Sequence, residues 1–299
     1  MPPAMDGNRT LRTAPIAPPA DIAHNAALAA LARGNRRAQA RAAQFRADLA
    51  VGRARANDVA QLKQQFPFHG LLPCHAAGHD FVMFTANDDV VAWEYFWRGP
   101  DGYEADSLTL WAGWCRSPGV VLDIGGYSGV MAIIAARANP ANTVHLFEPM
   151  ARTVERASIN IKLNRLQGQV TLHACAASDS AGAVQINTYR DADFPGTGNS
   201  IYAKPGKDVI DRVDVQTARV DDVLPDIVPT AIKIDVEGHE LACLHGMAAT
   251  IARARPRIII EVWDHDRAAV MAFLDAHGYR VWLIGPVDGP VANFAAVPR

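Results

Sequence analysis

Short, almost unbroken apolar runs dominate the part of the chain that follows Pro118. They cover residues 120–126, 143–149, 170–178, 231–238, 257–263 and 280–285. Helical segments separate most of them, at residues 129–138, 150–165, 239–255 and 266–278. Apolar strands that alternate with helices predict an α/β fold, in which a Rossmann-like, mostly parallel sheet carries helices on both faces.

One stretch breaks this rhythm. Between residues 183 and 220, two β-rich runs flank a Gly/Asp/Pro-rich segment, "RDADFPGTGNSIYAKPGKD". The pattern predicts a long loop inserted between strands, and loops of this kind often carry binding sites.

The first 117 residues follow a different pattern. Residues 1–20 are rich in Pro and Ala and are predicted to be disordered. Residues 21–62 predict an Ala/Arg-rich helical arm, either a solvated helix or a docking helix for a partner or a second subunit. Residues 63–117 predict a cap made of an aromatic hairpin and a helix, and residues 118–299 the main domain. We place the hairpin turn at Asn87–Asp89, so that its second strand carries Trp93, Tyr95, Phe96 and Trp97.

Composition and charge exclude several classes of function. The chain has 299 residues and a net charge of −2, so nothing global indicates binding to nucleic acid or to an anionic membrane. Few cationic residues lie between the aromatic residues of the cap, which argues against binding of single-stranded nucleic acid. Four widely spaced cysteines are typical of free thiols in a reducing compartment. No apolar run approaches the ~18 residues of a membrane span, and the first residues lack the apolar core of a secretory signal, so we expect a cytoplasmic protein.

The candidate functional residues lie where the predicted strands end. The first strand closes with "LDIGGYSG", which places Asp123, Gly125, Gly126 and Gly129 in a tight turn into the next helix. The spacing is D-x-G-x-x-x-G and differs from the dinucleotide fingerprint G-x-G-x-x-G. Glu148 ends the second strand, about 20 residues further on, where an acid can accept hydrogen bonds from both hydroxyls of a ribose. Together these residues predict an adenosine site.

The pattern resembles the FkbM-type family of class I S-adenosylmethionine-dependent methyltransferases. The resemblance rests on "VLDIGGYSGV", "HLFEP", Asn160 and Asn164, "AAS" at 176–178, "GNS" at 198–200, "IKIDVEGHE" and "RPRIIIEVW", and covers about residues 103–263. It implies S-adenosylmethionine as cofactor, with Asp123 at the amino-acid end and Glu148 on the ribose. The implied cofactor contacts are Asp123, Gly125, Gly126, Tyr127, Gly129, Glu148, Pro149, Ala177, Ser178, Asp179 and Asp235. The triplet Gly126-Tyr127-Ser128 departs from the family pattern, and Asp179 is as typical of a surface turn as of an adenine contact.

The stretch "DVEGHE" supplies the candidates for catalysis, Asp235, Glu237 and His239. The resemblance implies methylation of a hydroxyl on a sugar, glycan or natural product, which requires positioning and a base. Three interpretations stay open. In the first, Asp235 lies near the sulfonium, and Glu237, preferred over His239, orients or deprotonates the acceptor hydroxyl. In the second, Asp235, Glu237 and Glu261 bind a divalent cation. In the third, Glu237 only caps the next helix. The first of these needs no metal.

Further acceptor contacts are predicted at Glu261 and Trp263, which share one face of the next strand, and at Asn199 and Ser200 in the long loop. Two rival functions remain open: a nicotinamide-dependent oxidoreductase, and a non-catalytic scaffold that binds the cofactor in a biosynthetic complex. The oxidoreductase is weakened because the chain has neither G-x-G-x-x-G nor a Y-x-x-x-K pair.

Overall fold

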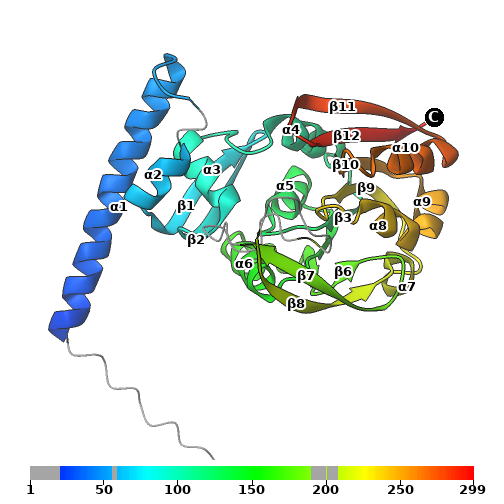
Figure 1. Cartoon of the computed structure of the whole chain (residues 1–299), viewed down its shortest axis with the longest axis horizontal. Coiled ribbons are helices and arrows are strands. Elements are labelled where there is room, and N and C mark those ends of the chain that lie inside the picture. The colour runs from blue at the N-terminus through cyan, green and yellow to red at the C-terminus, as the bar shows by residue number, and fades with distance from the viewer. Residues whose placement is uncertain (1–20, 56–58, 190–199, 201–207) are drawn as a thin grey trace, which may run out of the picture.

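A seven-stranded sheet forms the centre of the molecule in the computed structural model, which describes residues 21–55, 59–189, 200 and 208–299 (Figure 1). Its strand order is β11-β12-β10-β9-β3-β4-β5. The strands from β5 to β10 run parallel, and β12 runs antiparallel to both of its neighbours. Their bounds are β3 Val120–Ile124, β4 Thr143–Phe147, β5 Val170–His173, β9 Pro229–Ile234, β10 Arg257–Trp263, β11 Tyr279–Asp288 and β12 Val291–Pro298. The predicted α/β fold is confirmed.

Helices cover both faces of this sheet. One face packs against α4 (Ala105–Trp114), α5 (Val130–Ala138) and α6 (Ala151–Leu163), and the other against α8 (Glu240–Gly246), α9 (Ala248–Ala254) and α10 (Arg267–Ala276). Neighbouring residues of one strand enter opposite cores: Val121 joins the first and Leu122 the second. Burial on both faces explains why these strands have continuous apolar sequences.

The chain order creates a crevice between β3 and β9. From β3 the chain continues to β4 and β5 on one side, and it later returns to β9 and β10 on the other. In open α/β sheets, ligands bind beyond the carboxyl ends of the strands at such a switch point. The candidate residues of the sequence analysis therefore lie at the expected edge.

A second, three-stranded sheet has the order β6-β8-β7, formed by β6 (Ala176–Ala177), β7 (Gly182–Tyr189) and β8 (Val209–Ala218). The single strand predicted over 170–178 is wrong, because β5 ends at His173 and residues 176–177 pair with β8 instead. The helix predicted over 239–255 is also interrupted, since Met247 has φ −125° and ends α8. Short α7 (Val220–Val223) follows β8. The predicted disorder of residues 1–20, and the predicted loop apart from Ser200 and Asp208, lie outside the described residues.

The predicted hairpin around Asn87–Asp89 is wrong. The hairpin lies earlier, with β1 (His69–Ala76) and β2 (His79–Ala86) joined by Ala77 and Gly78, whose positive φ angles of 51° and 83° suit a tight two-residue turn. The aromatic residues form a helix, α3 (Val90–Arg98), because the Asp89 side chain caps it by accepting a hydrogen bond from the Ala92 amide at 2.9 Å.

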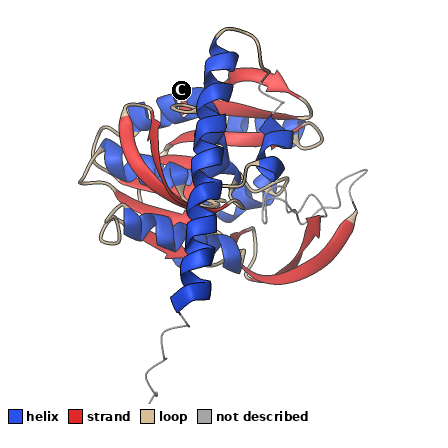
Figure 2. Cartoon of the chain, turned by 90° about the vertical axis from the view of Figure 1, so that its left-hand side faces the viewer, coloured by secondary structure: helices blue, strands red, loops and turns tan. Residues whose placement is uncertain are grey.

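The amino-terminal helix α1 (Asp21–Ala50) lies beside the hairpin and α3, and Figure 2 shows it running along one side of the molecule. Its second half is packed: Ala38, Ala42 and Phe45 are buried, and Phe45 meets the Trp97 ring edge to face at 6.2 Å. Residues 27–33 of this helix are open to solvent, and Leu28 among them is 50% exposed. Short α2 (Val59–Gln65) follows. No helix in the described part of the chain is long and apolar enough to cross a membrane.

Two asparagines of α6 attach the hairpin to the main sheet. Asn160 accepts a hydrogen bond from the Phe84 amide at 2.8 Å and donates to the Ser128 carbonyl at 2.9 Å. Asn164 exchanges two hydrogen bonds with the backbone of Val82. These side chains satisfy backbone groups of β2 that face away from β1.

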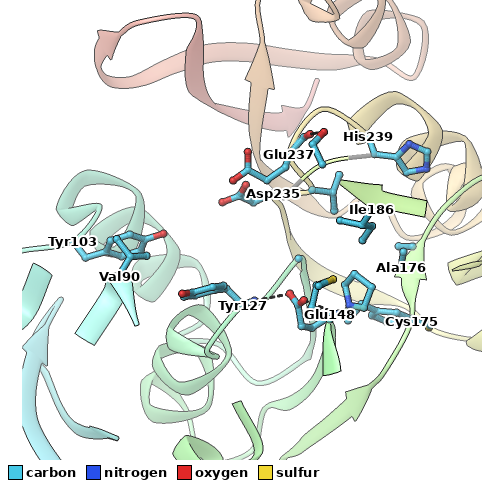
Figure 3. Close-up of a pocket in the computed structure, with 17 residues that line it drawn as sticks. Val90, Tyr103, Tyr127, Glu148, Cys175, Ala176, Ile186, Asp235, Glu237 and His239 are labelled. Atoms are coloured by element: carbon cyan, nitrogen blue, oxygen red, sulfur yellow. Dashed lines mark hydrogen bonds between the residues drawn. The ribbon is translucent and has the colours of Figure 1, made fainter. Parts of the chain in front are cut away.

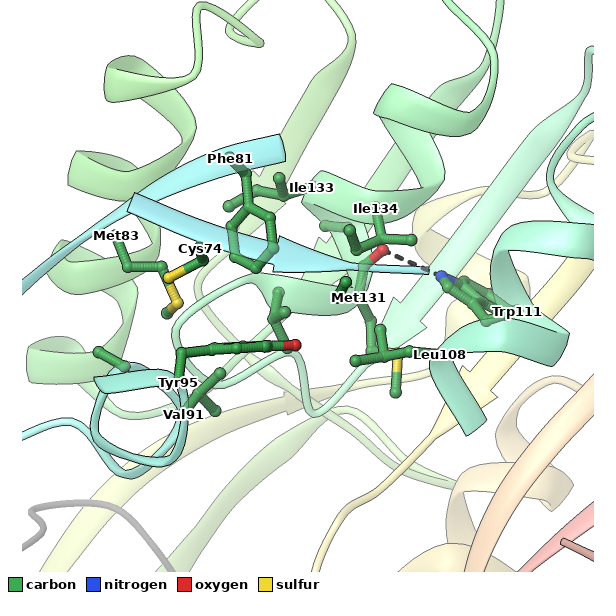
Figure 4. Packing of buried hydrophobic residues seen from close by; sticks show 14 of the residues in the cluster. Cys74, Phe81, Met83, Val91, Tyr95, Leu108, Trp111, Met131, Ile133 and Ile134 are labelled. Carbon is green, nitrogen blue, oxygen red and sulfur yellow. Dashed lines mark hydrogen bonds between the residues drawn. The ribbon is translucent and has the colours of Figure 1, made fainter. Parts of the chain in front are cut away.

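Apolar packing completes the attachment. Phe81 of β2 and Tyr95 of α3 pack beside Ile133 of α5 (Figure 4). Trp111 of α4 is fully buried and donates its indole N–H to the Met131 carbonyl at 3.0 Å.

Candidate active site

A cavity opens at the carboxyl ends of β3, β4 and β9 (Figure 3). It encloses about 830 Å³ of empty space, which includes the open space at its mouth. One wall is apolar and contains Phe147, Cys175, Ala177 and Ile186. Its polar lining includes Tyr103, Tyr127, Asp235, Glu237 and His239. The predicted contacts Gly125, Glu148, Pro149 and Ser200 also line it.

Glu148 is buried and tightly held. Its Oε1 accepts hydrogen bonds from Thr153 Oγ1 at 2.7 Å and the Met150 amide at 3.0 Å, and its Oε2 accepts one from the Tyr127 amide at 3.1 Å. Burial raises the pKa of Glu148, and these three hydrogen bonds oppose the rise. A carboxylate offers about four acceptor positions, so Oε2 keeps capacity for one further donor from the cavity.

The glycine turn brings β3 close to β9. A Cβ atom on Gly125 would lie 1.7 Å from the Asp235 carbonyl oxygen, and φ at Gly125 is +79°, so only glycine fits. Tyr127 takes the positive φ of 46° despite its side chain, which places its amide on Glu148 and its ring in the cavity. The departure from the family pattern at this triplet therefore leaves the turn intact.

Asp123 does not line the main cavity. Its side chain faces a smaller adjoining chamber, which also contains Gly126. Oδ2 of Asp123 accepts a hydrogen bond from the Ala132 amide at 2.8 Å, so it fixes the start of α5. Burial raises the pKa of Asp123 to about 7, although Lys233 opposes the shift.

The acidic stretch after β9 turns sharply rather than staying extended. Glu237 has φ +55° and Gly238 has φ +98°, so alternation along a strand does not apply to Asp235 and Glu237. Both nevertheless line the cavity. Ser200 donates to the Glu237 carbonyl at 2.6 Å and thereby supports this turn.

The interpretation of Glu237 as a helix cap is wrong. The residue at the N-cap position of α8 is His239, and the carboxylate that reaches back is that of Glu240, whose Oε1 accepts a hydrogen bond from the Gly238 amide at 3.0 Å. His239 lines the cavity, shares a hydrogen bond with Ser178 Oγ at 2.9 Å, and has its pKa lowered by burial. The imidazole is therefore neutral at pH 7.

Besides Asp123 and Gly126, five further predicted contacts lie outside the main cavity. Ser178 is buried behind it against His239, and Gly129 supports the start of α5. Asp179 is exposed and accepts a hydrogen bond from Ser180 Oγ, as a turn residue does. Glu261 and Trp263 also lie away from its lining. Asn199 is outside the described residues.

The predicted cation cluster has a different membership. Glu104, Asp235 and Glu261 can bring their carboxylate oxygens within 4.8 Å of one another, whereas Glu237 is not part of this group. Lys233 lies among them, with Nζ 3.4 Å from Asp235 Oδ2. Burial alone would lower the pKa of Lys233, but Asp235 and Glu104 raise it above its ordinary value. A protein ammonium therefore already supplies positive charge to this cluster.

Several site residues were missed by the sequence analysis. Tyr103 was assigned to a helix, yet it precedes α4 and reaches into the cavity (Figure 3). Glu104 adopts the left-handed φ of 38°, for which the sequence gives no signal. Lys233 was visible as a charged residue inside an apolar run, and that signal was not used.

The cavity fits an adenosine-based cofactor. Its apolar wall suits a planar base, and the open position on Glu148 Oε2 suits a ribose hydroxyl. These features are observed on residues of this chain and do not depend on any relative.

Comparisons with known proteins place this site in context. The sequence model of the Methyltransferase FkbM domain matches residues 123–281, just over half of the 299 residues. Methyltransferase sdnD of Sordaria araneosa is 26% identical, over 54% of this chain and 73% of that protein.

Two solved structures are also similar. The methyltransferase FkbM of Methylobacillus flagellatus KT is 18% identical with a TM-score of 0.44, over 60% of this chain and only 43% of that one. The precorrin-6y C5,15-methyltransferase of Geobacter metallireducens GS-15 is 16% identical with a TM-score of 0.41, over 65% of this chain and 89% of that one.

Proposed function

Because the chain belongs to the FkbM methyltransferase family, we propose that it transfers a methyl group from S-adenosylmethionine to a hydroxyl group of a sugar, glycan or natural product. One observation carries the proposal. Glu148, with an open acceptor position, and the acidic turn after β9 line the same cavity, so a nucleoside donor and an acceptor would meet there.

The donor is assigned to the side of the cavity next to β4. Phe147, Cys175 and Ala177 would cover the adenine, and Glu148 would accept a hydrogen bond from the ribose. Pro149 adjoins Glu148 and completes this wall. Asp179 is omitted from the donor contacts because it is exposed and outside the lining.

The acceptor is assigned to the side that carries Glu237 and His239. When bound, the cofactor supplies a methyl group activated by a sulfonium. The task of these residues is to hold the acceptor hydroxyl in line and to accept its proton. Glu237 is our first candidate because it lines the cavity and is held in a strained turn by Ser200. Neutral His239 is the second, since its imidazole can take a proton.

The two rival functions predict different ligands. A nicotinamide-dependent oxidoreductase would bind NAD at Glu148, and a scaffold would bind the donor without turnover. In a thermal-shift comparison, S-adenosylhomocysteine at ~100 times its dissociation constant should stabilise the protein by ~2.7 kcal/mol, whereas NAD should have no effect. Stabilisation by NAD alone would refute the proposal.

Two variants test the roles of individual residues. Glu148→Gln should weaken S-adenosylhomocysteine by ~10-fold or more in calorimetry, because the amide cannot accept on both atoms. Glu155→Gln, an exposed change on α6, is the matched control and should leave binding unchanged. Glu237→Gln should keep donor binding but lower turnover on a panel of sugars, lipid-linked glycans and small alcohols. If the wild-type protein binds the donor yet methylates none of a broad panel, the scaffold gains support.

A further inference from the structure

The smaller chamber beside the main cavity contains an unusual density of charge. The two spaces adjoin each other, since both are lined by Tyr103, Gly125, Tyr127 and Asp235. The chamber adds Glu104, Asp123 and Lys233, together with apolar side chains of α3 and α5, namely Val91, Val130 and Met131.

Carboxyl groups outnumber ammonium groups around this chamber. Glu104, Asp235 and Glu261 form one cluster of carboxylates, and Asp123 adjoins them across the strand pairing with Lys233. Lys233 is the one ammonium that faces them in the described residues. Four carboxyl groups share one ammonium, and burial raises the pKa of Glu104, Asp123 and Glu261, so an additional cation would favour their ionised forms.

Glu104 has an open hydrogen-bonding position in this chamber. Its Oε2 is completely buried and accepts no hydrogen bond from any described residue. Burial raises the pKa of Glu104, Lys233 opposes the rise, and the hydroxyls of Tyr103 and Ser107 oppose it further by hydrogen bonding. A buried carboxylate oxygen without a donor is unfavourable, and a ligand with N–H donors would satisfy it.

Resting on the proposed function, which places the amino-acid end of S-adenosylmethionine beside Asp123, we propose that Glu104 is the principal acceptor for the α-ammonium group of that cofactor. An ammonium carries three N–H donors and a single positive charge. Glu104 Oε2 and the Asp235 carboxylate, which is 23% exposed, offer acceptors on adjoining walls. Glu104 lies outside residues 123–281, so the segment before the family domain contributes directly to donor binding.

Two other occupants fit less well. A divalent cation would be repelled by the Lys233 ammonium, which is already 3.4 Å from Asp235 Oδ2. The acceptor hydroxyl is better placed in the main cavity, because Glu237 and His239 line that cavity and not the chamber.

Ligand pairs test the inference without an activity assay. S-adenosylhomocysteine carries the ammonium, and its deaminated analogue, S-adenosyl-4-thiobutyrate, differs only in lacking it. In calorimetry on the wild-type protein, we expect the analogue to bind about 10- to 100-fold more weakly. The Glu104→Gln variant should bind S-adenosylhomocysteine more weakly by the same factor, while its affinity for the analogue should be unchanged. Glu104→Asp should restore part of the loss.

A matched control variant tests whether the effect on binding is specific to Glu104. Asp106→Asn removes an exposed carboxylate two residues away and should leave both affinities unchanged. The inference is overturned if Glu104→Gln weakens both ligands equally, or if it weakens neither. It is also overturned if Mg²⁺ alone raises Tm in a Glu104-dependent manner, since the cluster is then a cation site. If neither ligand binds the wild-type protein, the proposed function itself fails. The wild-type comparison holds even if the variant does not fold.

Discussion

Replacing Gly125 by alanine probes the contact on which the site depends. The added Cβ would lie 1.7 Å from the Asp235 carbonyl oxygen, where ordinary contact begins at 3.4 Å, so the two strand ends must separate by about 1.7 Å. Asp235 is also joined to β3 by its own amide, which donates to the Ile124 carbonyl at 2.9 Å.

The expected cost has three parts. An alanine at φ +79° costs about 1–2 kcal/mol, because left-handed backbone crowds its Cβ. Loss of the hydrogen bond between β9 and β3 adds about 1 kcal/mol. Repacking around the displaced strand end adds about 1 kcal/mol more. We therefore expect a loss of about 3–4 kcal/mol in the free energy of unfolding, together with loss of donor binding.

Gly129→Ala separates strain from overlap. Gly129 has a similar φ of +92°, yet the nearest atom to an added Cβ would be 3.6 Å away. Urea denaturation should therefore show a loss of only about 1–2 kcal/mol for this variant. If Gly125→Ala proves no more destabilising than Gly129→Ala, the close approach of β3 and β9 does not have the importance assigned to it.

Two further predictions concern the core and pH. Trp111→Phe removes a buried hydrogen bond and leaves a small void, so the free energy of unfolding measured by urea denaturation should fall by about 2 kcal/mol. Trp282→Phe, at a side chain that is 39% exposed, should change it by no more than about 0.5 kcal/mol. Equal effects of the two substitutions would contradict the packing described. Burial raises the pKa of Asp123 from 3.8 to about 7. Between these two pH values, the folded state therefore keeps a proton on Asp123 that the unfolded chain has released. Stability of the ligand-free protein should then fall as pH rises from about 4 to 7 and level off above. Asp123→Asn should reduce that fall by up to about 4 kcal/mol in urea titrations at several pH values, and an unchanged profile would show that Asp123 ionises normally.

The central part of the sheet was predictable because β3, β4, β9 and β10 are buried on both faces. Such strands have continuous apolar sequences, and the order of acids and glycines at their ends led to the proposed donor site. Glu148 was identified in this way, and its position in the cavity agrees with the prediction. The hairpin was missed because its turn is Ala77-Gly78, a weak signal beside Asn87-Asp88-Asp89. The acids at that position instead cap a helix, which short-range patterns do not separate from a turn.

Contacts between distant segments were beyond sequence reasoning. Tyr103 and Glu104 reach the site only because α4 packs against α5, and the left-handed backbone at Glu104 has no sequence signature. Glu261 was expected beside the acceptor because it ends an adjacent strand. It faces the carboxylate cluster with Glu104 and Asp235 instead, since strand alternation places it on the face of Asp123 and Lys233.

The single amide of Asn160 touches both the hairpin, at Phe84, and the glycine turn, at Ser128. Shortening the chain to residues 118–299 would expose that amide on one side and remove Glu104 as well. Chimeras that exchange acceptor preference between related enzymes would therefore need to carry the hairpin and α6 across as one piece. A chimera joined at the start of β3 would combine the hairpin of another protein with Asn160 of this one, and the hydrogen bond between Asn160 and the hairpin would then be at risk.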